Sequence, residues 1–321
     1  MAKILVTGGS GFIGTNLVSK LIEQGYEVAN IDTLPPRNKL HNDVWTRIDI
    51  TDRAKTLAFV AEFSPDYCYH LAARTDLNGK ELTDYSANIS GVTNIVDALK
   101  MCKSLQYAVF ASSMLVCQLG HSPKNDDDFC PTTIYGESKV LGELVVKKLG
   151  KLHYPWTIVR PTSIWGPWFR APYRDFFTKI QQRLYFHPKN RVVKRNYGFV
   201  YNTVNQLISL MASESLHHSM TYLADPEPLS LKRWGDLISL ELHGTRVRDL
   251  PVGIFKILAC LGDVLGQIGY KKFPMNSFRL NNMSTTALFS VDSLTAISGD
   301  GPYTADEGVK ITCDWIRSHD D

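Results

Sequence analysis

Apolar and polar positions change period repeatedly through the first half of the chain. Short apolar runs typical of buried strands are followed by stretches in which apolar residues recur every three or four positions, as in amphipathic helices. The first such helix carries Ile13, Leu17 and Leu21 on one face and follows an apolar strand at the start of the chain. We expect further strands at 27–31, 45–48, 67–71, 107–111 and 156–159, and further helices at 52–63, 82–103 and 133–149.

This alternation indicates an α/β fold in which a parallel sheet carries helices on both faces, the doubly wound arrangement of a Rossmann-type domain. The alternation ends at Pro167. We therefore expect residues 1–167 to form one domain, and residues 168–321 to form mainly a smaller C-terminal α/β cap over the carboxyl ends of the strands. Later segments, including 222–224 and a helix at 231–242, are expected to extend the sheet and complete the cap.

The turn between the first strand and the first helix is rich in glycine, with the sequence Thr7-Gly8-Gly9-Ser10-Gly11-Phe12-Ile13-Gly14. Gly8 permits a tight turn, Gly11 lets the backbone approach a pyrophosphate, and Gly14 lets the helix pack close to the strand. The helix N-terminus offers free N–H groups and a positive dipole end to phosphates. In this context the motif predicts a dinucleotide site, with an ordinary glycine-rich turn as the alternative.

An acidic residue, Asp32, ends the second strand about twenty residues after the glycine turn. A carboxylate there accepts hydrogen bonds from the adenosine ribose hydroxyls and repels a 2′-phosphate, which favours NAD over NADP. Arg37 lies close downstream and could pair with such a phosphate. The simpler alternative is that Asp32 caps a loop.

Composition narrows the class of protein. With 321 residues, 44% hydrophobic, 21% charged and a net charge of +3, the chain has the profile of a folded protein and not of a dedicated nucleic-acid binder. The six cysteines are scattered, without a C-x-x-C pair or close histidine partners, so we expect no metal site and a reducing compartment. Because the N-terminus leads directly into a strand, we expect no signal peptide and a cytoplasmic location.

Residues 251–270 form the most apolar segment of the chain. Lys256, Asp263 and Gln267 interrupt it, and the uninterrupted runs are far shorter than the ~20 residues of a membrane-spanning helix. We interpret the segment as a partly buried helix of the second domain. A contact with a membrane surface or with a second subunit is the alternative.

Residues 168–195 are aromatic and strongly basic, with Asp175 as the one acidic residue. Such asymmetry indicates either a site for an anionic ligand or a solvated basic face. The basic residues of this segment are Arg170, Arg174, Lys179, Arg183, Lys189, Arg191, Lys194 and Arg195.

Tyr135 and Lys139 lie four residues apart on one predicted helix face. An ammonium group beside a phenol lowers its pKa, so that the phenolate can take a proton from a hydroxyl while hydride leaves the same carbon. Ser113 ends the preceding strand, from where it can hydrogen-bond the same substrate oxygen. For the neighbouring Ser112 a loop-capping role is equally open.

Further motifs extend this set along the chain. They are Asp49-Ile50, His70-Leu71-Ala72-Ala73, Asn88 with Asn94, Arg160-Pro161-Thr162-Ser163-Ile164-Trp165-Gly166-Pro167, Phe289-Ser290-Val291-Asp292 and Thr304-Ala305-Asp306-Glu307-Gly308. In this order, over essentially the whole chain, they resemble the extended short-chain dehydrogenase/reductases of the NAD-dependent epimerase/dehydratase group. Its best-known members act on nucleotide sugars, and the resemblance implies NAD as cofactor.

The resemblance also implies roles for individual residues. The implied catalytic residues are Ser113, Tyr135 and Lys139. The implied cofactor-binding residues are Gly8, Gly11, Phe12, Ile13, Gly14, Asp32, Asp49, Ile50, Leu71, Ala72, Ala73, Asn88, Ser112, Tyr135, Lys139 and Pro161. The expected substrate-binding residues are Arg74, Ser113, Met114, Ser163, Arg174 and Arg195. We regard His70 as a packed residue and not a catalytic one.

Several departures from the family pattern concern the substrate. Met114-Leu115 replace the Asp-Glu pair of the 4,6-dehydratases and cannot transfer protons, which disfavours a dehydratase. Cys117-Gln118 replace Tyr-Gly at the pocket rim, and Ser163 replaces an asparagine of many sugar epimerases. The family's usual acidic pair is absent at Asn202-Thr203.

Three hypotheses remain open. The first is an epimerase of nucleotide-activated sugars, which oxidises a ring hydroxyl and returns the hydride to the other face. The second is a one-way dehydrogenase or 4-keto-sugar reductase, or an enzyme of hydroxysteroid-like substrates. The third is a non-catalytic, cofactor-binding regulator. The resemblance further implies a homodimer formed by the helices at 82–103 and 133–149.

Overall fold

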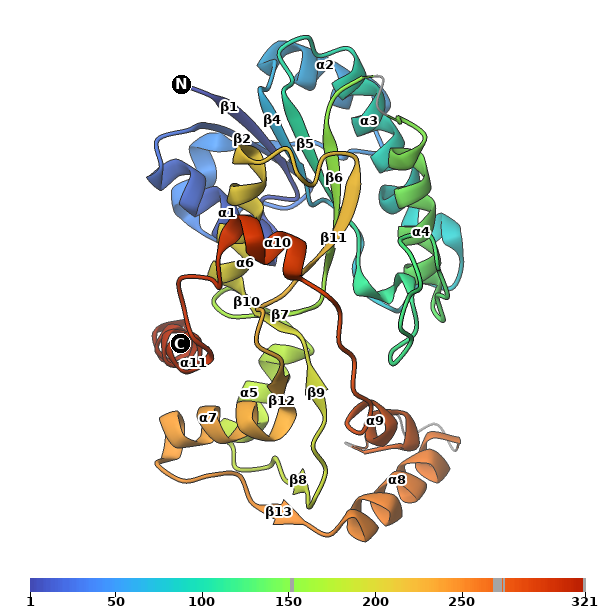
Figure 1. The fold of residues 1–321 in the computed structure, drawn as a ribbon, viewed down its shortest axis with the longest axis vertical. Coiled ribbons are helices and arrows are strands. Elements are labelled where there is room, and N and C mark those ends of the chain that lie inside the picture. Colours follow the sequence, from blue (N-terminus) through green and yellow to red (C-terminus); the bar gives the residue numbers. More distant parts are fainter. Residues whose placement is uncertain (151–152, 268–272, 274, 320–321) are drawn as a thin grey trace.

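A parallel sheet and the helices on its two faces make up the upper part of the molecule in a computed structural model, which describes residues 1–150, 153–267, 273 and 275–319 (Figure 1). The sheet has seven parallel strands in the order β11-β6-β5-β4-β1-β2-β3. The strand order reverses beside β1, which confirms the doubly wound Rossmann-type fold. The strands are β1 (Lys3–Thr7), β2 (Glu27–Asp32), β3 (Trp45–Arg47), β4 (Tyr67–His70), β5 (Tyr107–Ala111), β6 (Trp156–Pro161) and β11 (Ser219–Leu223).

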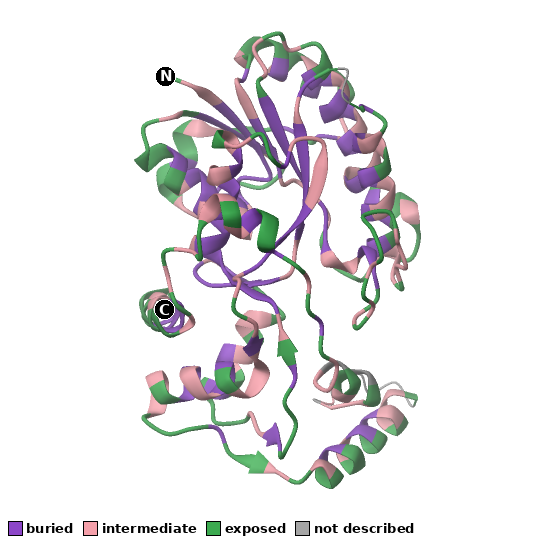
Figure 2. Cartoon of the chain, in the orientation of Figure 1, coloured by how far each residue is buried: buried purple, intermediate pink, exposed green. Residues whose placement is uncertain are grey.

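Two sets of helices cover the two faces of the sheet. One face packs against α2 (Arg53–Phe63), α3 (Val92–Lys100) and α4 (Ile134–Lys147), and the other against α1 (Phe12–Glu23), α6 (Val200–Ser209) and α10 (Asp292–Ser298). The inner strands β1, β2, β4, β5 and β6 are mostly buried, whereas the edge strands β3 and β11 are partly exposed, as are the outer faces of the helices (Figure 2).

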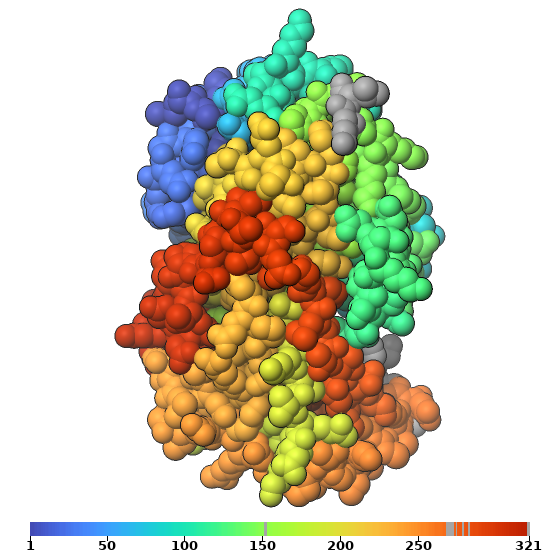
Figure 3. Space-filling model, viewed as in Figure 1, coloured from blue at the N-terminus to red at the C-terminus, as the bar shows by residue number. Residues whose placement is uncertain are grey.

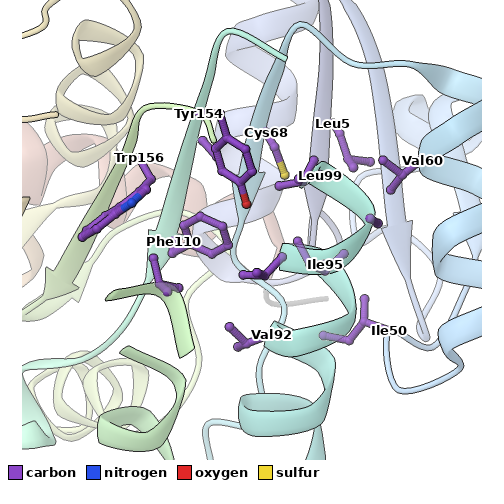
Figure 4. Packing of buried hydrophobic residues seen from close by; sticks show 14 of the residues in the cluster. Leu5, Ile50, Val60, Cys68, Val92, Ile95, Leu99, Phe110, Tyr154 and Trp156 are labelled. Carbon is purple, nitrogen blue, oxygen red and sulfur yellow. The ribbon is translucent and has the colours of Figure 1, made fainter. Parts of the chain in front are cut away.

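The core beneath α3 shows how the apolar pattern positions a helix. Val92, Ile95 and Leu99 face the sheet and pack in one cluster with Leu5 and Phe110 (Figure 4). Each of these side chains is at least 94% buried, which stabilises the fold by about 1.5–3 kcal/mol per residue.

The helix expected at 82–103 is wrong as a single element. The segment begins as a 3₁₀ turn (Leu82–Tyr85), continues as a π-helical turn (Ala87–Gly91) and becomes α-helical only in α3. The change of pitch turns the Asn88 side chain inward, where its amide nitrogen donates to Arg74 O at 3.0 Å and to Ser138 Oγ at 2.9 Å. Tertiary hydrogen bonds therefore override the helical period here.

The lower part of the molecule is built on aromatic side chains. Trp165 and Trp234 lie at the centre of a buried cluster to which α5 (Tyr173–Gln181), α7 (Leu231–His243) and α11 (Ala305–His319) contribute. Short strand pairs complete this part, and they join β7 (Ser163–Trp165) to β10 (Tyr197–Phe199), β9 (Lys194–Arg195) to β12 (Leu229–Ser230), and β8 (His187–Pro188) to β13 (Asp249–Leu250).

The chain crosses between the two parts more than once. After β10 it returns upward through α6 and β11, so that β11 extends the sheet as expected, whereas α7 at 231–243 belongs to the lower part. A later segment, 283–291, runs over the surface between α9 (Ser277–Asn282) and α10 (Figure 3). There Phe289 stacks on Tyr222 with ring centroids 4.3 Å apart.

The apolar segment 251–270 forms α8 (Val252–Gln267) as far as it is described, and residues 268–270 lie outside the described part. The expected partial burial is found, because Phe255 and Ala259 face inward while Ile257 and Leu261 are exposed. Within the described part of the chain, no helix has the length and apolar character needed to cross a membrane.

Candidate active site

The glycine turn lies directly against the loop that follows β4. Gly8 has φ +75°, and a Cβ there would come within 2.5 Å of Ala72 N. A Cβ on Gly14 would come within 2.2 Å of Gly8 O, so only glycine lets α1 pack this close to the turn. Gly11 N donates to Gly8 O at 2.9 Å, and Gly11 has no side chain with which to cap α1. The first turn of α1 therefore starts without side-chain competition for an anion.

Asp32 sits at the end of β2 beside this turn. Its carboxylate accepts hydrogen bonds from Ser10 N at 3.1 Å and Leu34 N at 3.0 Å. Burial raises the pKa of Asp32, while those N–H groups and the charge of Arg37 lower it. Arg37 also donates to Trp168 O. Asp32 and Arg37, the potential partner of a 2′-phosphate, are thus neighbours, as their spacing in the sequence indicated.

The other residues expected near a cofactor lie along the same edge of the sheet. Asp49 accepts two hydrogen bonds from Thr51, and Ile50 O accepts one from Asn94 Nδ2 at 2.9 Å. Asn88 is fully buried, and its amide oxygen and nitrogen both bond to protein groups. It therefore positions the Arg74 backbone and Ser138 of α4.

The structure brings Ser113, Tyr135 and Lys139 together. Ser113 follows β5, and its Oγ accepts a hydrogen bond from Leu115 N at 3.1 Å. Tyr135 and Lys139 lie one turn apart on α4, and both are at least 94% buried. The Ser113 hydroxyl lies close enough to Tyr135 to lower the pKa of the phenol, and Lys139 Nζ donates to Ala111 O at 3.0 Å. A hydroxyl, a phenol and an amine thus converge at the carboxyl end of β5.

The expected lowering of the Tyr135 pKa by Lys139 is not seen in the protein alone. Burial raises the pKa of Tyr135, the Ser113 hydroxyl lowers it in part, and Tyr85 adds to the rise. Burial also lowers the pKa of Lys139 to about 8, against the opposing influence of Glu143. Tyr135 is therefore held as a phenol in a strongly desolvated site, where nearby charge acts strongly on it.

A buried ion pair that the apolar pattern does not reveal supports α4, the helix that carries Tyr135 and Lys139. Glu143, four residues after Lys139, accepts hydrogen bonds from Arg160 Nε and Nη2, both at 2.8 Å. Arg160 is the last residue but one of β6 and also donates to Asp126 O at 2.8 Å. The spacing of Tyr135, Lys139 and Glu143 along one helix face was the available signal.

Among the expected substrate-binding residues, Ser163 and Arg195 are linked through Tyr173. The Tyr173 hydroxyl donates to Ser163 Oγ at 2.5 Å, and the charge of Arg195 lowers the Tyr173 pKa that burial raises. Arg174 instead stacks on Phe169 and Trp315, with its guanidinium carbon 5.9 Å from each ring centroid.

Two further expected substrate residues, Arg74 and Met114, lie near the strand ends. Arg74 pairs with Asp76 at 2.8 Å and lies over the Tyr85 ring, whose centroid is 6.0 Å from that of Tyr135. Met114 packs against the cluster that contains Tyr222.

The chain matches a known protein family over much of its length. Residues 4–214 match the NAD-dependent epimerase/dehydratase family, which is more than half of the chain. The chain belongs to this family. The family is NAD-dependent, which confirms the predicted cofactor.

Three known proteins illustrate what this chain is similar to. A 3-beta-hydroxysteroid dehydrogenase of Mycolicibacterium neoaurum is 31% identical over 255 residues, covering 72% of this chain and 68% of that protein. An N-acetyl-alpha-D-glucosaminyl-diphospho-ditrans,octacis-undecaprenol 4-epimerase of Escherichia coli O157:H7 is 22% identical, covering 98% and 96%. The structure of a Thermotoga maritima UDP-glucose 4-epimerase with UDP-glucose superposes with a TM-score of 0.77 at 18% identity, covering 99% and 100%.

The site of this family member has the features that NAD requires. The cradle at Gly8, Gly11 and Gly14 admits no Cβ without displacement or close contact, so its main chain is free to face a pyrophosphate. The buried Oγ of Ser112 and Nε2 of His70 have no hydrogen-bond partner among the described residues, and both line a small cavity behind Lys139. His70 itself is packed, with Nδ1 2.7 Å from Thr7 Oγ1.

The expectation that the chain has no metal site stays a prediction, but three potential ligands come close together in the structure. They are Cys117, His121 and Cys130, whose potential metal-ligand atoms all lie within 4.8 Å of one another. The loop that joins Ser113 to Tyr135 folds back on itself and makes this contact, which no sequence spacing indicated.

Proposed function

We propose that the protein is an NAD-dependent epimerase of a nucleotide-activated sugar. The observation that carries the proposal is the convergence of Ser113, Tyr135 and Lys139 at the carboxyl end of β5. Met114 and Leu115, which follow, bring no acid or base for water elimination. Further support comes from the E. coli epimerase, which aligns over 98% of this chain.

Each residue has a distinct task in the proposed reaction. NAD supplies a hydride acceptor when bound. Ser113 hydrogen-bonds the sugar hydroxyl and orients it, and Tyr135 takes its proton and later returns it. The Lys139 ammonium, fixed by Ala111 O, binds the nicotinamide ribose, and together with the positive charge of bound NAD it would favour the phenolate form of Tyr135. The buried site excludes water, which protects the keto intermediate until the hydride returns.

We propose that the diphosphate and sugar bind to the lower part of the molecule. Ser163, Tyr173 and Arg195 present two hydroxyls and a guanidinium group along β7, α5 and β9. Arg195 Nε also donates to Thr285 O at 3.2 Å, which ties this group to the surface segment 283–291. We propose that Arg195 contacts the diphosphate. We also propose that Arg174 leaves its position over the Phe169 and Trp315 rings to contact the same anion.

The decisive experiment follows both sugar and cofactor. The purified protein is incubated with UDP-, GDP-, dTDP- and CDP-sugars, and products are separated while NADH is followed by absorbance. We expect an epimeric product from one sugar with no net NADH. Tyr135→Phe should lower the rate by about 10²–10⁴-fold. Tyr67→Phe, which removes a hydroxyl bonded to Gln106 at 2.9 Å on the surface, should leave it unchanged. Stoichiometric NADH with each product would contradict an epimerase.

A second candidate is a one-way dehydrogenase of an apolar alcohol. The observation that favours it is the exposed stripe of α8, where Ile257 is 65% exposed and Leu261 50%. The 31% identity to a hydroxysteroid dehydrogenase points the same way. Oxidation of a sterol alcohol with equimolar formation of NADH would establish this function.

The third hypothesis, a non-catalytic regulator, has a different test. Full biological activity of a Tyr135→Phe variant would support it.

We further propose a cytoplasmic homodimer. The six cysteines are all free thiols, which fits a reducing compartment. We propose that a second copy of the chain binds to a shallow groove on the outer face of α4. The groove is lined by Ile89, Leu141, Leu144 and Val145. Leu144→Asp should convert the dimer to a monomer in light scattering, whereas a wild-type protein that is monomeric at micromolar concentration would contradict the proposal.

A further inference from the structure

Three metal-binding side chains meet in the loop between Ser113 and Tyr135. Cys117 follows the short 3₁₀ turn Met114–Val116, Cys130 precedes α4 by four residues, and His121 lies between them. Their potential ligand atoms lie within 4.8 Å of one another. Around a tetrahedral zinc ion with Zn–S of ~2.3 Å and Zn–N of ~2.0–2.1 Å, the ligand atoms would be roughly 3.5–3.8 Å apart. Small side-chain rotations would bring these three groups to that spacing.

The main chain holds the loop in this form without help from an ion. The main chain at Cys117 and Cys130 forms an isolated parallel β-bridge. In this bridge Gln118 N donates to Cys130 O at 2.9 Å, and Cys130 N donates to Val116 O at 3.0 Å. His121 N donates to Gln118 O at 3.1 Å. The ligands are therefore brought together in advance, which lowers the entropy cost of binding.

The second partner of His121 is the one that a zinc-bound histidine generally has. His121 Nε2 lies 3.1 Å from Asp128 Oδ2, and Lys124 N donates to the same carboxylate oxygen at 2.9 Å. A carboxylate bonded to one ring nitrogen fixes the tautomer and leaves the other nitrogen, here Nδ1, to bind a metal. Asp128 is thereby an oriented partner of the ligand.

We propose that Cys117, His121 and Cys130 bind one zinc ion, with water as the fourth ligand. Two thiolates and an imidazole are a donor set that suits zinc. The ion would tie the end of β5, which carries Ser113, to the start of α4, which carries Tyr135. Gly136 of α4 already packs against Leu115 O in this region. The site is thus a structural clamp on the catalytic pair and not a part of the hydride transfer.

The test measures metal and not activity, so it is independent of the proposed function. The full chain is purified without chelator from zinc-supplemented medium, and zinc is determined by mass spectrometry. We expect about one zinc per chain. His121→Gln and Cys130→Ser should lose it, and the control Cys260→Ser, which changes an exposed cysteine of α8, should keep it. Asp128→Asn should weaken zinc affinity by about 10–100-fold in competition with a chromophoric chelator.

Cobalt substitution separates the site from adventitious binding. Co²⁺ bound in place of zinc should give a thiolate-to-metal absorption band in the wild type and in Cys260→Ser but not in Cys130→Ser. A folded wild-type protein that holds no zinc and gives no such band would overturn the proposal. A Cys117–Cys130 disulfide in protein purified under reducing conditions would overturn it as well. His121 is partly exposed, so we expect His121→Gln to fold. Circular dichroism of this variant checks that a loss of metal is not a loss of fold.

Discussion

The Arg160 guanidinium holds the Glu143 carboxylate through two hydrogen bonds of 2.8 Å, and both side chains are at least 98% buried. Removing one partner leaves the other charge buried without compensation. We therefore expect Arg160→Met or Glu143→Gln to lower the free energy of unfolding by about 3–5 kcal/mol, measured by urea denaturation.

An exposed pair provides the control for this prediction. Arg53 contacts Asp97 at 2.6 Å on the surface, and Arg53→Met should cost less than about 1 kcal/mol. The double change Glu143→Leu with Arg160→Met should recover much of the loss, because two apolar side chains can replace a buried ion pair. Equal losses for the buried and exposed pairs would contradict this account.

The close approach of α1 to the glycine turn predicts a large effect of one methyl group. A Cβ at position 14 would lie 2.2 Å from Gly8 O, which is main chain and cannot rotate away. Gly14→Ala should therefore lower stability by at least about 1–3 kcal/mol and weaken NAD binding in titration calorimetry. Gly253→Ala in α8 meets nothing within 4 Å, and should be neutral or stabilising by up to about 1 kcal/mol.

Cofactor selectivity should depend on Asp32. Its replacement by serine keeps a hydroxyl acceptor for Ser10 N but removes the negative charge beside Arg37. We expect Asp32→Ser to weaken NAD binding and to improve the NADP/NAD affinity ratio at least tenfold, about 1.4 kcal/mol. Asp52→Ser, at the N-cap of α2 where serine also caps, is the matched control. An unchanged ratio would show that Asp32 does not face the adenosine ribose.

The buried Lys139 predicts a specific dependence of stability on pH. Its pKa is lowered from 10.5 to about 8 by burial, so folding must bury a cation below pH 8 but a neutral amine above it. In unfolded chains Lys139 keeps its proton up to about pH 10.4. The contribution of Lys139 to stability therefore improves as the pH rises from about 8 to 10.5.

The measurement compares wild type with Lys139→Met by denaturation across this range. The wild type should gain up to about 3 kcal/mol relative to Lys139→Met between pH 8 and 10.5, because the methionine variant does not titrate there. Lys100→Met, which changes a surface lysine paired with Asp97 at 3.6 Å, should show little such gain. A constant difference between wild type and Lys139→Met would mean that the amine is not desolvated.

The apolar periods predicted the sheet well because they report burial directly. Each strand expected from β2 to β6 lies within two residues of its predicted ends, and the helix expected at 52–63 begins with Asp52 as its N-cap. The approach of Ser113 to Tyr135 also followed from the sequence, because the carboxyl ends of parallel strands meet at one edge of a sheet.

Contacts between distant segments were not predictable in the same way. The π-helical turn at Ala87–Gly91 depends on hydrogen bonds of Asn88 to Arg74 and Ser138, which no local period encodes. The meeting of Cys117 with Cys130 depends on a loop folding back, and the stacking of Arg174 on Trp315 depends on where α11 packs. The domain boundary at residue 167 and the roles of the individual site residues stay predictions.

The edge strand β11 is synthesised well after β6, the strand with which it pairs. β6 is complete at Pro161, but its outer edge pairs only with Ser219–Leu223. At 5–20 residues per second, Leu223 is added about 3 to 12 s after Pro161. For part of that time the nascent chain carries an apolar strand with an open edge, the kind of surface through which chains aggregate. The open edge of β6 must therefore be protected during translation, although β11 covers it in the finished fold.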